Sequence, residues 1–593
     1  MQSHSFIVCV VLAVSAILST PRGFGQTPAP ATSSSIPTTP TILHANANLV
    51  LVDVIVTDKG KAIHSLDRGS FHVFEDGREQ AISTFDEHHP AATPLTPNRI
   101  KLPPHTYSNI PVYPDAGVVN VLLLDGLNTP AANQMDMRRQ MIEYLGKVQP
   151  GTTLAIFTLA SELRLVEGFT TDPSQLAKAI ASSKGNPSVL LDPASAQSLD
   201  EATDDMINAY TTAEAVASMR QFAADVGAYQ MDVRVRMTLD GLKDLARYLS
   251  SIPGRKNLIW FSGSFPIALD PDDTLRSPFN AMRNYSEDIR ETNDLLSAAR
   301  VAVYPVDARG LLSGPSVEAS YKSRGNPATA GANFARDTAR FMASTLNEQA
   351  TMQQVAEQTG GQEYVNTNGL KEAVANAIEN GSSYYIVGYI PANSKFDGQF
   401  HKIQVHLDNS TYKLAYRRGY YADARDKALA QASGRPNLLV EAALHGAPPA
   451  TQILFQARIL PASDPLLKGL NLPAAPAGAM AASLKAPTAR YVAQMTVDPR
   501  HFTYEENPDG TRKVSIEFAA LAYDADGKRI NYYDRPIQLS LKPEQYTRLM
   551  ATGIPATIAL DLPAGQIFLR LVVVDQAAGH AGSLEIPVTV KAP

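Results

Sequence analysis

Apolar and polar residues alternate with a period of two in two separate parts of the chain, which is the pattern of β-strands with one buried face. The first part is 48–85, and the second runs from Tyr384 to Arg417. Each part offers only a few short strands, too few to be stable alone in water. We therefore predict that 46–90 and 384–420 pair into one small, discontinuous β-sandwich, with the intervening chain inserted between its halves.

Between these two parts, short apolar runs alternate with segments of helical period. Val118–Leu124 is continuously apolar, which is typical of a parallel strand buried on both faces. A predicted helix over Ala131–Lys147 follows it, and further strands are predicted at 257–261 and 301–306. This alternation predicts a doubly wound α/β domain over 115–382, with helices on both faces of a mainly parallel sheet.

The last part of the chain, 438–593, returns to short apolar strands with turn signals between them. Asp509-Gly510 and Asp526-Gly527 are dipeptides that favour hairpin turns. We predict a C-terminal all-β, Ig-like sandwich here, joined to the preceding part by a linker helix over 421–437.

The N-terminus carries an apolar run, Phe6–Leu18, that is shorter than the roughly 20 residues a membrane-spanning helix needs. Small residues follow it, so we predict that 1–25 form a signal peptide and that the Pro/Thr/Ser-rich segment 26–45 is a disordered linker. The mature protein is then secreted, periplasmic or bound to the cell envelope, without a transmembrane segment. Cys9 is the only cysteine, so the mature chain can form no disulfide and no thiolate metal site.

Composition and motifs narrow the function classes. The chain has 593 residues, and its 52 Lys and Arg against 58 Asp and Glu give a net charge of −6, without the basic surplus typical of nucleic-acid-binding proteins. The sequence contains no His-Glu-x-x-His pair, no phosphate-binding loop and no Gly-x-Ser-x-Gly elbow. The adjacent His88 and His89 are interpreted as surface residues. We predict a protein that is not an enzyme.

Six motifs together carry a family resemblance. They are Val54-x-Val56-x-Asp58-x-Gly60, Phe71-His72-Val73-Phe74-Glu75-Asp76-Gly77, Leu122-Leu123-Leu124-Asp125, Tyr304-Pro305-Val306-Asp307-Ala308-Arg309-Gly310, Tyr385-Ile386-Val387-Gly388-Tyr389-Ile390-Pro391 and Arg417-Arg418-Gly419-Tyr420. Over about 49–420 the chain resembles the von Willebrand factor type A (VWA) family, and more narrowly the VWFA-related proteins of acidobacteria. The resemblance implies a VWA-like, Rossmann-type sheet in the α/β domain. It also implies an adhesion-type protein that engages a protein or a cell-surface polymer.

The resemblance further implies a metal-ion-dependent adhesion site at the end of the first α/β strand. The matched positions are Asp125, Thr129, Thr170 or Thr171, and Ser262. Such oxygen donors suit Mg²⁺ or Ca²⁺. Leu127 replaces one hydroxyl of the family pattern, and no aspartate follows Phe261, so the implied site is degenerate. We expect weak binding of Mg²⁺ or Ca²⁺ at best, because fewer carboxylates attract a cation less strongly.

The same loop has a structural interpretation that the sequence leaves open. Thr129 and Pro130 suit the N-cap and first position of the following helix, and Asp125 can accept hydrogen bonds from backbone amides. Asp307, at the end of the fifth strand, is either a strand-end cap or the carboxylate that completes a metal shell.

Two further function classes also stay open. The chain can be a structural or assembly component of the cell envelope, with the VWA-like domain as a scaffold. A hydrolase that uses Ser262 or a metal at Asp125 lacks an evident base.

Overall fold

The described part of the chain is a mixed α/β structure with several separate sheets. The computed structural model describes residues 49–89, 101–113, 118–149, 151–182, 213–263, 285–311, 330–392, 399–422, 438–472, 476–484 and 487–591. The predicted signal peptide (1–25) and linker (26–45), and nearly all of the predicted linker helix (421–437), lie outside these ranges. Within them, no helix is both long and apolar enough to cross a membrane.

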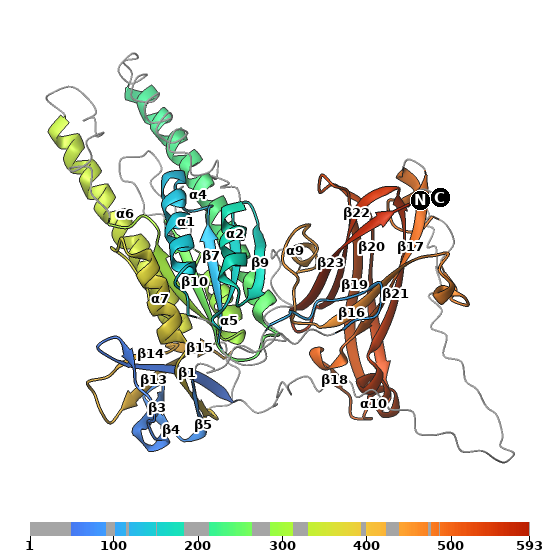
Figure 1. Cartoon of the computed structure of the whole chain (residues 1–593), viewed down its shortest axis with the longest axis horizontal. Coiled ribbons are helices and arrows are strands. Elements are labelled where there is room, and N and C mark those ends of the chain that lie inside the picture. Colours follow the sequence, from blue (N-terminus) through green and yellow to red (C-terminus); the bar gives the residue numbers. More distant parts are fainter. Residues whose placement is uncertain are drawn as a thin grey trace.

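The central α/β domain is built on a five-stranded sheet (Figure 1). Its strands are β7 (Val119–Asp125), β8 (Thr153–Leu159), β9 (Leu163–Thr170), β10 (Lys256–Ser262) and β11 (Val301–Asp307). The order is β11-β10-β7-β8-β9; neighbouring strands are parallel except for the antiparallel pair β8 and β9. Every residue of β7, β10 and β11 is buried, which explains their continuous apolar sequences.

Helices cover both faces of this sheet, because successive side chains of a strand point to opposite faces. Leu122 and Leu124 of β7 share a core with α1 (Ala131–Leu145), α2 (Pro173–Ser182) and α7 (Leu370–Gly381). Their neighbours Val121 and Leu123 share the opposite core with α4 (Ala213–Leu249), α5 (Ser286–Ala298) and α6 (Ala330–Thr359). Figure 1 shows that α4 and α6 extend well past the sheet at one end.

A small β-sandwich joins the segments before and after the α/β domain. Its elements are β1 (Val50–Asp58), β2 (Lys61–Ala62), β3 (Phe71–Glu75), β4 (Arg78–Gln80), β5 (Ile82–His88), β12 (Tyr384–Tyr389), β13 (Phe400–Leu407), β14 (Lys413–Ala415) and β15 (Gly419–Tyr421). One sheet has the order β14-β1-β12-β5 and the other β15-β13-β3-β4. The predicted pairing across more than 300 residues is present, since Val50 lies opposite Tyr389 and Val54 opposite Tyr385.

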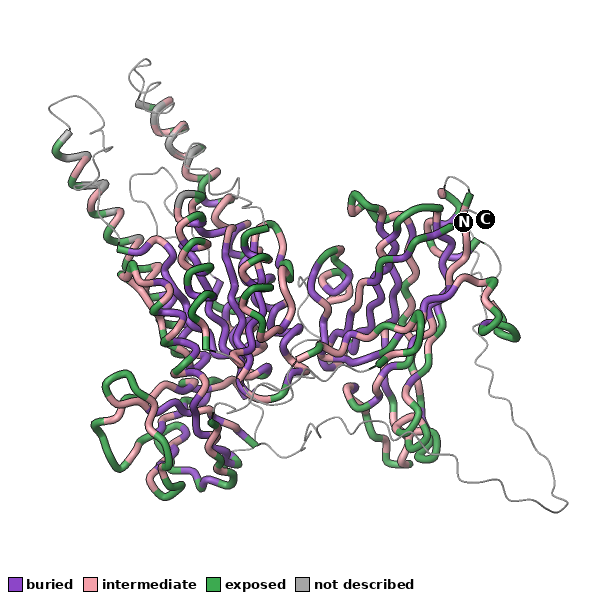
Figure 2. The backbone as a smooth tube through the Cα atoms, viewed as in Figure 1, coloured by how far each residue is buried: buried purple, intermediate pink, exposed green. Residues whose placement is uncertain are grey.

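Two further sheets form a C-terminal β unit around a second large apolar core (Figure 2). Its elements are α9 (Leu438–Ala442), β16 (Phe455–Pro461), β17 (Thr488–Val497), β18 (Glu505–Glu506), β19 (Arg512–Tyr523), β20 (Arg529–Leu541), α10 (Pro543–Thr552), β21 (Ile554–Pro563), β22 (Gly565–Asp575) and β23 (His580–Val590). The sequence did not predict its edge strand β6 (Thr106–Ser108), which comes from the chain between β5 and β7 and pairs with β16.

The α/β domain contacts the C-terminal unit through the end of α4. Thr451 donates a hydrogen bond to the carbonyls of Arg247 (3.0 Å) and Tyr248 (2.8 Å), at the helix terminus where carbonyls lack partners. The Arg247 guanidinium also pairs with Glu441 at 2.8 Å. Polar groups at the end of α4 thus find hydrogen-bond and ion-pair partners in the C-terminal unit.

A buried ammonium group lies where the α/β domain meets the small β-sandwich. Lys256, at the start of β10, is 2% exposed and donates to the carbonyl of Ala299 at 2.7 Å. Next to it, Arg300 pairs with Asp53 of β1 at 2.6 Å. Burial lowers the pKa of Lys256 to about 7; the charge of Arg300 also lowers it, whereas Asp53 opposes this.

We expect Lys256→Met to stabilise the chain most strongly below pH 7. There the folded wild type carries a buried charge, and replacing a buried charge with an apolar side chain of similar size gains about 1–4 kcal/mol. Between pH 7 and the ordinary lysine pKa of 10.5, the folded state has lost this proton and the unfolded state has not. The free energy of unfolding of wild type therefore rises with pH across this window. The advantage of Lys256→Met over wild type becomes smaller over the same range.

Urea unfolding of both proteins between pH 6 and pH 10 measures this difference. Lys371→Met, at a more exposed lysine of α7, is the control and should change little at any pH. A gain from Lys256→Met that is the same at every pH would contradict the assignment of a proton-dependent cost to Lys256.

Candidate functional site

The candidate site lies at the C-terminal end of β7, where Asp125 is fully buried. Its Oδ1 accepts a hydrogen bond from the backbone N–H of Asn128 at 2.9 Å. Its Oδ2 accepts from the Asn128 side chain (2.8 Å), the Trp260 indole (3.1 Å) and the Ser262 hydroxyl (2.9 Å). Burial raises the pKa of Asp125 above its ordinary value, although these hydrogen bonds oppose the shift. The carboxylate therefore accepts hydrogen bonds at both oxygens from groups of this chain.

This arrangement does not fit a divalent cation. A metal ion needs lone pairs that face a common point, whereas the donor hydrogens of Asn128, Trp260 and Ser262 point at Oδ2 of Asp125, and the Asn128 backbone amide points at Oδ1. A cation would have to displace these buried donors and leave them without acceptors. The geometry supports one part of the structural interpretation of the loop, namely that Asp125 accepts a hydrogen bond from a backbone amide.

A second layer brings a positive charge close to the carboxylate. Asn128 uses its amide oxygen to accept from Arg234 of α4, at 3.3 Å from Nε and 3.1 Å from Nη2. The Asn128 amide nitrogen also donates to Thr238 at 2.8 Å. Burial lowers the pKa of Arg234, and the nearby Asp125 and Glu348 raise it. A guanidinium thus supplies cationic charge beside Asp125.

Thr129 has a different role from the predicted helix cap. Helix α1 begins at Ala131 with Pro130 at the N-cap and no side-chain cap, so the predicted cap at Thr129 is wrong. The Thr129 hydroxyl instead accepts from the backbone N–H of Gly263 at 2.9 Å. A Cβ at Gly263 would lie 2.8 Å from the Asn128 carbonyl, so only glycine fits this close approach.

Thr170 and Thr171 do not belong to this site, which corrects the assignment implied by the family resemblance. In the sheet, Asp125 lies opposite Leu159 at the end of β8, whereas Thr170 lies opposite Leu154 near its start. Five residues of β-strand separate these levels by about 16 Å. The Thr170 hydroxyl donates a hydrogen bond to Gln175 at 3.3 Å. This contact lies at the opposite end of the strands from Asp125.

Asp307 is also separate from Asp125. Ser262 of β10 lies opposite Asp307 of β11, which places the backbones of Asp125 and Asp307 two strands apart, at about 10 Å. Asp307 is fully buried and accepts from Arg309 at 3.0 Å and 2.9 Å. Arg309 in turn pairs with Glu348 of α6 at 2.6 Å. Asp307 is therefore held in an ion pair and does not complete a shell around Asp125.

The sequence reading missed three residues that determine this centre, namely Trp260, Arg234 and Thr238. Trp260 is the only tryptophan of the chain, and its place in an apolar strand indicated only core packing. Arg234 and Thr238 are four residues apart on α4 and therefore share one helix face. The i, i+4 spacing of this polar pair was the only signal in the sequence, and it does not show that the pair is buried.

Large apolar side chains are exposed around and beyond these strand ends. Met135 lies on α1, Phe222 and Tyr229 on α4, and Met342 and Leu346 on α6. The spacing of seven on α4 and of four on α6 places each pair on one face of its helix. These five exposed residues lie on three different helices, and we refer to them together as the apical apolar surface.

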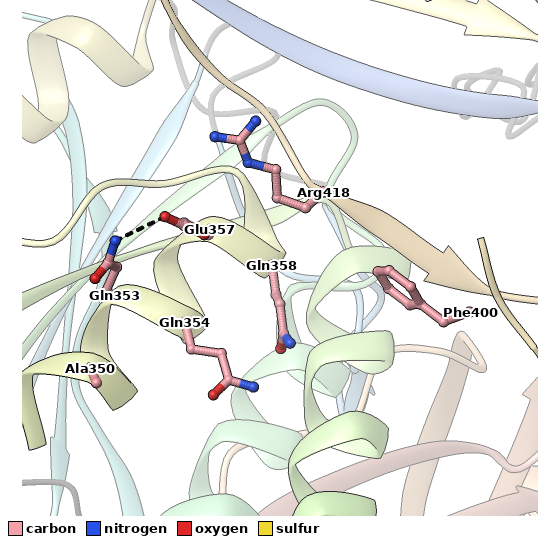
Figure 3. Close-up of a pocket in the computed structure, with 7 residues that line it drawn as sticks. All are labelled: Ala350, Gln353, Gln354, Glu357, Gln358, Phe400 and Arg418. Atoms are coloured by element: carbon pink, nitrogen blue, oxygen red, sulfur yellow. Dashed lines mark hydrogen bonds between the residues drawn. The ribbon is translucent and has the colours of Figure 1, made fainter. Parts of the chain in front are cut away.

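Two pockets among the described residues lie elsewhere. One, of about 270 Å³, is lined by Ala350, Gln353, Gln354, Glu357, Gln358, Phe400 and Arg418 (Figure 3). It lies between the later half of α6 and the small β-sandwich. Gln353 donates to Glu357 at 3.0 Å along the helix, so these two groups satisfy each other. The lining carries no arrangement of a nucleophile and a base.

No family model matches the sequence, and a search of curated proteins finds no match. Similar solved structures include an aerotolerance-related membrane protein from Bacteroides fragilis NCTC 9343, with 11% identity over 44% of this chain and 98% of that chain (TM-score 0.22). The pilus adhesin SpaC from Lactobacillus rhamnosus GG shows 7% identity over 85% and 57% (TM-score 0.24). A protein described as von Willebrand factor type A from Catenulispora acidiphila shows 7% identity over 88% and 76% (TM-score 0.18). Likenesses this low leave function to be argued from the site itself.

Proposed function

We propose that this chain is an exported, non-enzymatic binding protein of the adhesion type, with a VWA-like α/β domain that engages a partner protein. The observation that carries the proposal is the apical apolar surface. It lies at the end of the sheet where open α/β folds bind their ligands, beyond the C-terminal ends of parallel strands. On this proposal, binding there does not depend on Mg²⁺ or Ca²⁺, because the Asp125 carboxylate already accepts four hydrogen bonds from the chain.

The chemistry of this surface favours a protein over a polymer of sugars. Tyr229 and Leu346 are each 66% exposed, and Met135 is 75% exposed. Burying one large apolar side chain against a partner gains about 1.5–3 kcal/mol. Aromatic residues and methionine are enriched in the buried centres of protein interfaces.

The buried hydroxyl of Ser262 supports a non-enzymatic role. It is fully buried and donates to Asp125, and the Asp125 carboxylate is itself occupied by other donors. A serine nucleophile needs a free base and access to substrate. Neither requirement is met at this position.

Binding of the purified full chain to an envelope fraction tests the proposal. We expect Leu346→Ser combined with Tyr229→Ser to weaken binding at least tenfold, because two apolar anchors are lost. The matched control is Leu466→Ser in the C-terminal unit, where the leucine is 65% exposed. All variants should keep the wild-type melting temperature. Equal binding by the double variant and the control would contradict the proposal.

A second candidate is an assembly component in which the α/β domain serves only as a scaffold. The internally satisfied Asp125 centre favours it, because that centre contributes to stability without facing a ligand. In this case the apical variants bind like wild type. EDTA has no effect on binding under either candidate, so the apical variants alone separate the two.

A further inference from the structure

Three potential metal ligands lie together on the small β-sandwich, remote in the chain from Asp125. His64 follows β2, Glu87 belongs to β5, and His89 comes directly after that strand. Glu87 and His89 are two residues apart, so they share one face of the strand. His88 points to the other face, where it stacks on Tyr384 with ring centroids 4.9 Å apart. From the sequence alone, His88 and His89 were interpreted as surface residues.

The spacing of the donor atoms matches that of a zinc site. Nδ1 of His64 lies 3.2 Å from Oε1 of Glu87, and Nε2 of His89 lies 3.6 Å from the same oxygen. One potential ligand atom from each residue lies within 4.8 Å of the other two. Tetrahedral Zn²⁺ with bonds of about 2.0–2.1 Å separates its ligand atoms by about 3.3–3.4 Å. Small movements of the side chains bring all three ligand atoms to this spacing.

The surrounding structure holds these ligands in place. Ser65, which adopts a left-handed φ of 60°, donates its backbone N–H to both oxygens of Glu87 at 3.1 and 3.0 Å. The buried Tyr385 hydroxyl donates to the Ile63 carbonyl at 3.0 Å and accepts from Leu66 N–H at 3.1 Å. The loop is therefore fixed on both sides of His64. Such outer contacts orient the ligands of metal sites.

We propose that His64, Glu87 and His89 form a binding site for Zn²⁺. Two imidazoles and one carboxylate are the ligand set of many zinc sites with three protein ligands, whereas Mg²⁺ and Ca²⁺ prefer oxygen donors alone. The two histidine side chains are 44% and 55% exposed, so a fourth ligand comes from water or from a partner molecule. A bound Zn²⁺ would link the loop after β2, through His64, to the end of β5, through Glu87 and His89. It is independent of the proposed apical binding surface.

Isothermal titration of Zn²⁺ into the full chain, without a histidine tag, tests the site. We expect one ion per chain, and at least a tenfold loss of affinity in His64→Ala, His89→Ala and Glu87→Gln. Zn²⁺ should also raise the melting temperature of wild type, because a ligand that binds only the folded state stabilises it. Melting of the metal-free variants shows that they are folded.

His72→Ala is the matched control. Its imidazole is 42% exposed and also contacts two carboxylates, Glu79 at 2.9 Å and Asp408 at 3.1 Å. These carboxylates lie at opposite ring nitrogens, so they do not converge with the imidazole on one ion. Absence of stoichiometric binding, or equal affinity of wild type and all three site variants, would overturn the proposal and leave an ion-paired surface cluster. Visible absorption of bound Co²⁺, lost in His64→Ala but kept in His72→Ala, provides an independent readout.

Discussion

Asp125→Ala is expected to lower the free energy of unfolding of the α/β domain by about 3–5 kcal/mol, because it leaves several buried donors without an acceptor. The affected donors belong to Asn128, Trp260 and Ser262, all of which point at the lost carboxylate. Arg234 also loses the opposite charge nearest to it on this side. Urea unfolding followed by tryptophan fluorescence measures the loss directly, since Trp260 is the only tryptophan.

The control is Asp136→Ala on α1, where the carboxylate is 44% exposed and pairs with Arg139. An exposed ion pair contributes no more than about 1 kcal/mol, so this change should be small. Wild type should unfold at the same urea concentration in Mg²⁺, Ca²⁺ or EDTA. A large stabilisation by either ion that disappears in Asp125→Ala would show that the carboxylate is a metal ligand after all.

Arg570→Met is expected to destabilise the C-terminal unit by about 2–4 kcal/mol. Arg570 of β22 is 1% exposed, and its guanidinium donates to the carbonyls of Ala442, Ala447 and Pro448. Methionine fills much of the same volume but leaves these buried acceptors without a partner. The segment that joins α9 to β16 should therefore loosen first.

Hydrogen exchange of the peptide amides in 438–453, together with thermal unfolding, measures the effect. Arg548→Met on the exposed face of α10 is the control and should leave both unchanged. Faster exchange confined to 438–453 is the expected result. If hydrogen exchange and stability were unchanged in Arg570→Met, the prediction would be wrong. The three carbonyls would then find other hydrogen-bond donors without a loss of folding free energy.

Much of the fold follows from local patterns in the sequence. The continuous apolar run of β7 indicated a strand buried on both faces, and every residue of it is buried. The pairing of β1 with β12 was predictable because short strands with one apolar face must find a partner. By contrast, β6 has only three residues and no alternation that distinguishes it from a loop. Its pairing depends on contacts with a distant part of the chain.

The candidate site was less predictable, for two physical reasons. A family pattern gives the order of residues along the chain but not their register, so Thr170 was assigned to the end of the sheet opposite to where it lies. Arg234 lies in a helix rich in charged residues, where a buried guanidinium cannot be told from a solvated one by sequence. The domain boundaries, signal peptide and absence of enzymatic activity stay predictions.

The path of β6 has a consequence for the order in which this chain folds during synthesis. Ser108 and Phe455 are joined by a hydrogen bond across 347 residues, and Asn109 bonds to Ala450, Ile453 and Phe455 beside it. While the ribosome is still translating, β1, β3, β5 and β6 emerge long before their distant partners β12, β13 and β16, and unpaired strand edges favour aggregation. The described strands of the α/β sheet all find their partners within that domain, so we expect it to close first. The small sandwich follows once β15 is made, and the C-terminal unit recruits β6 last.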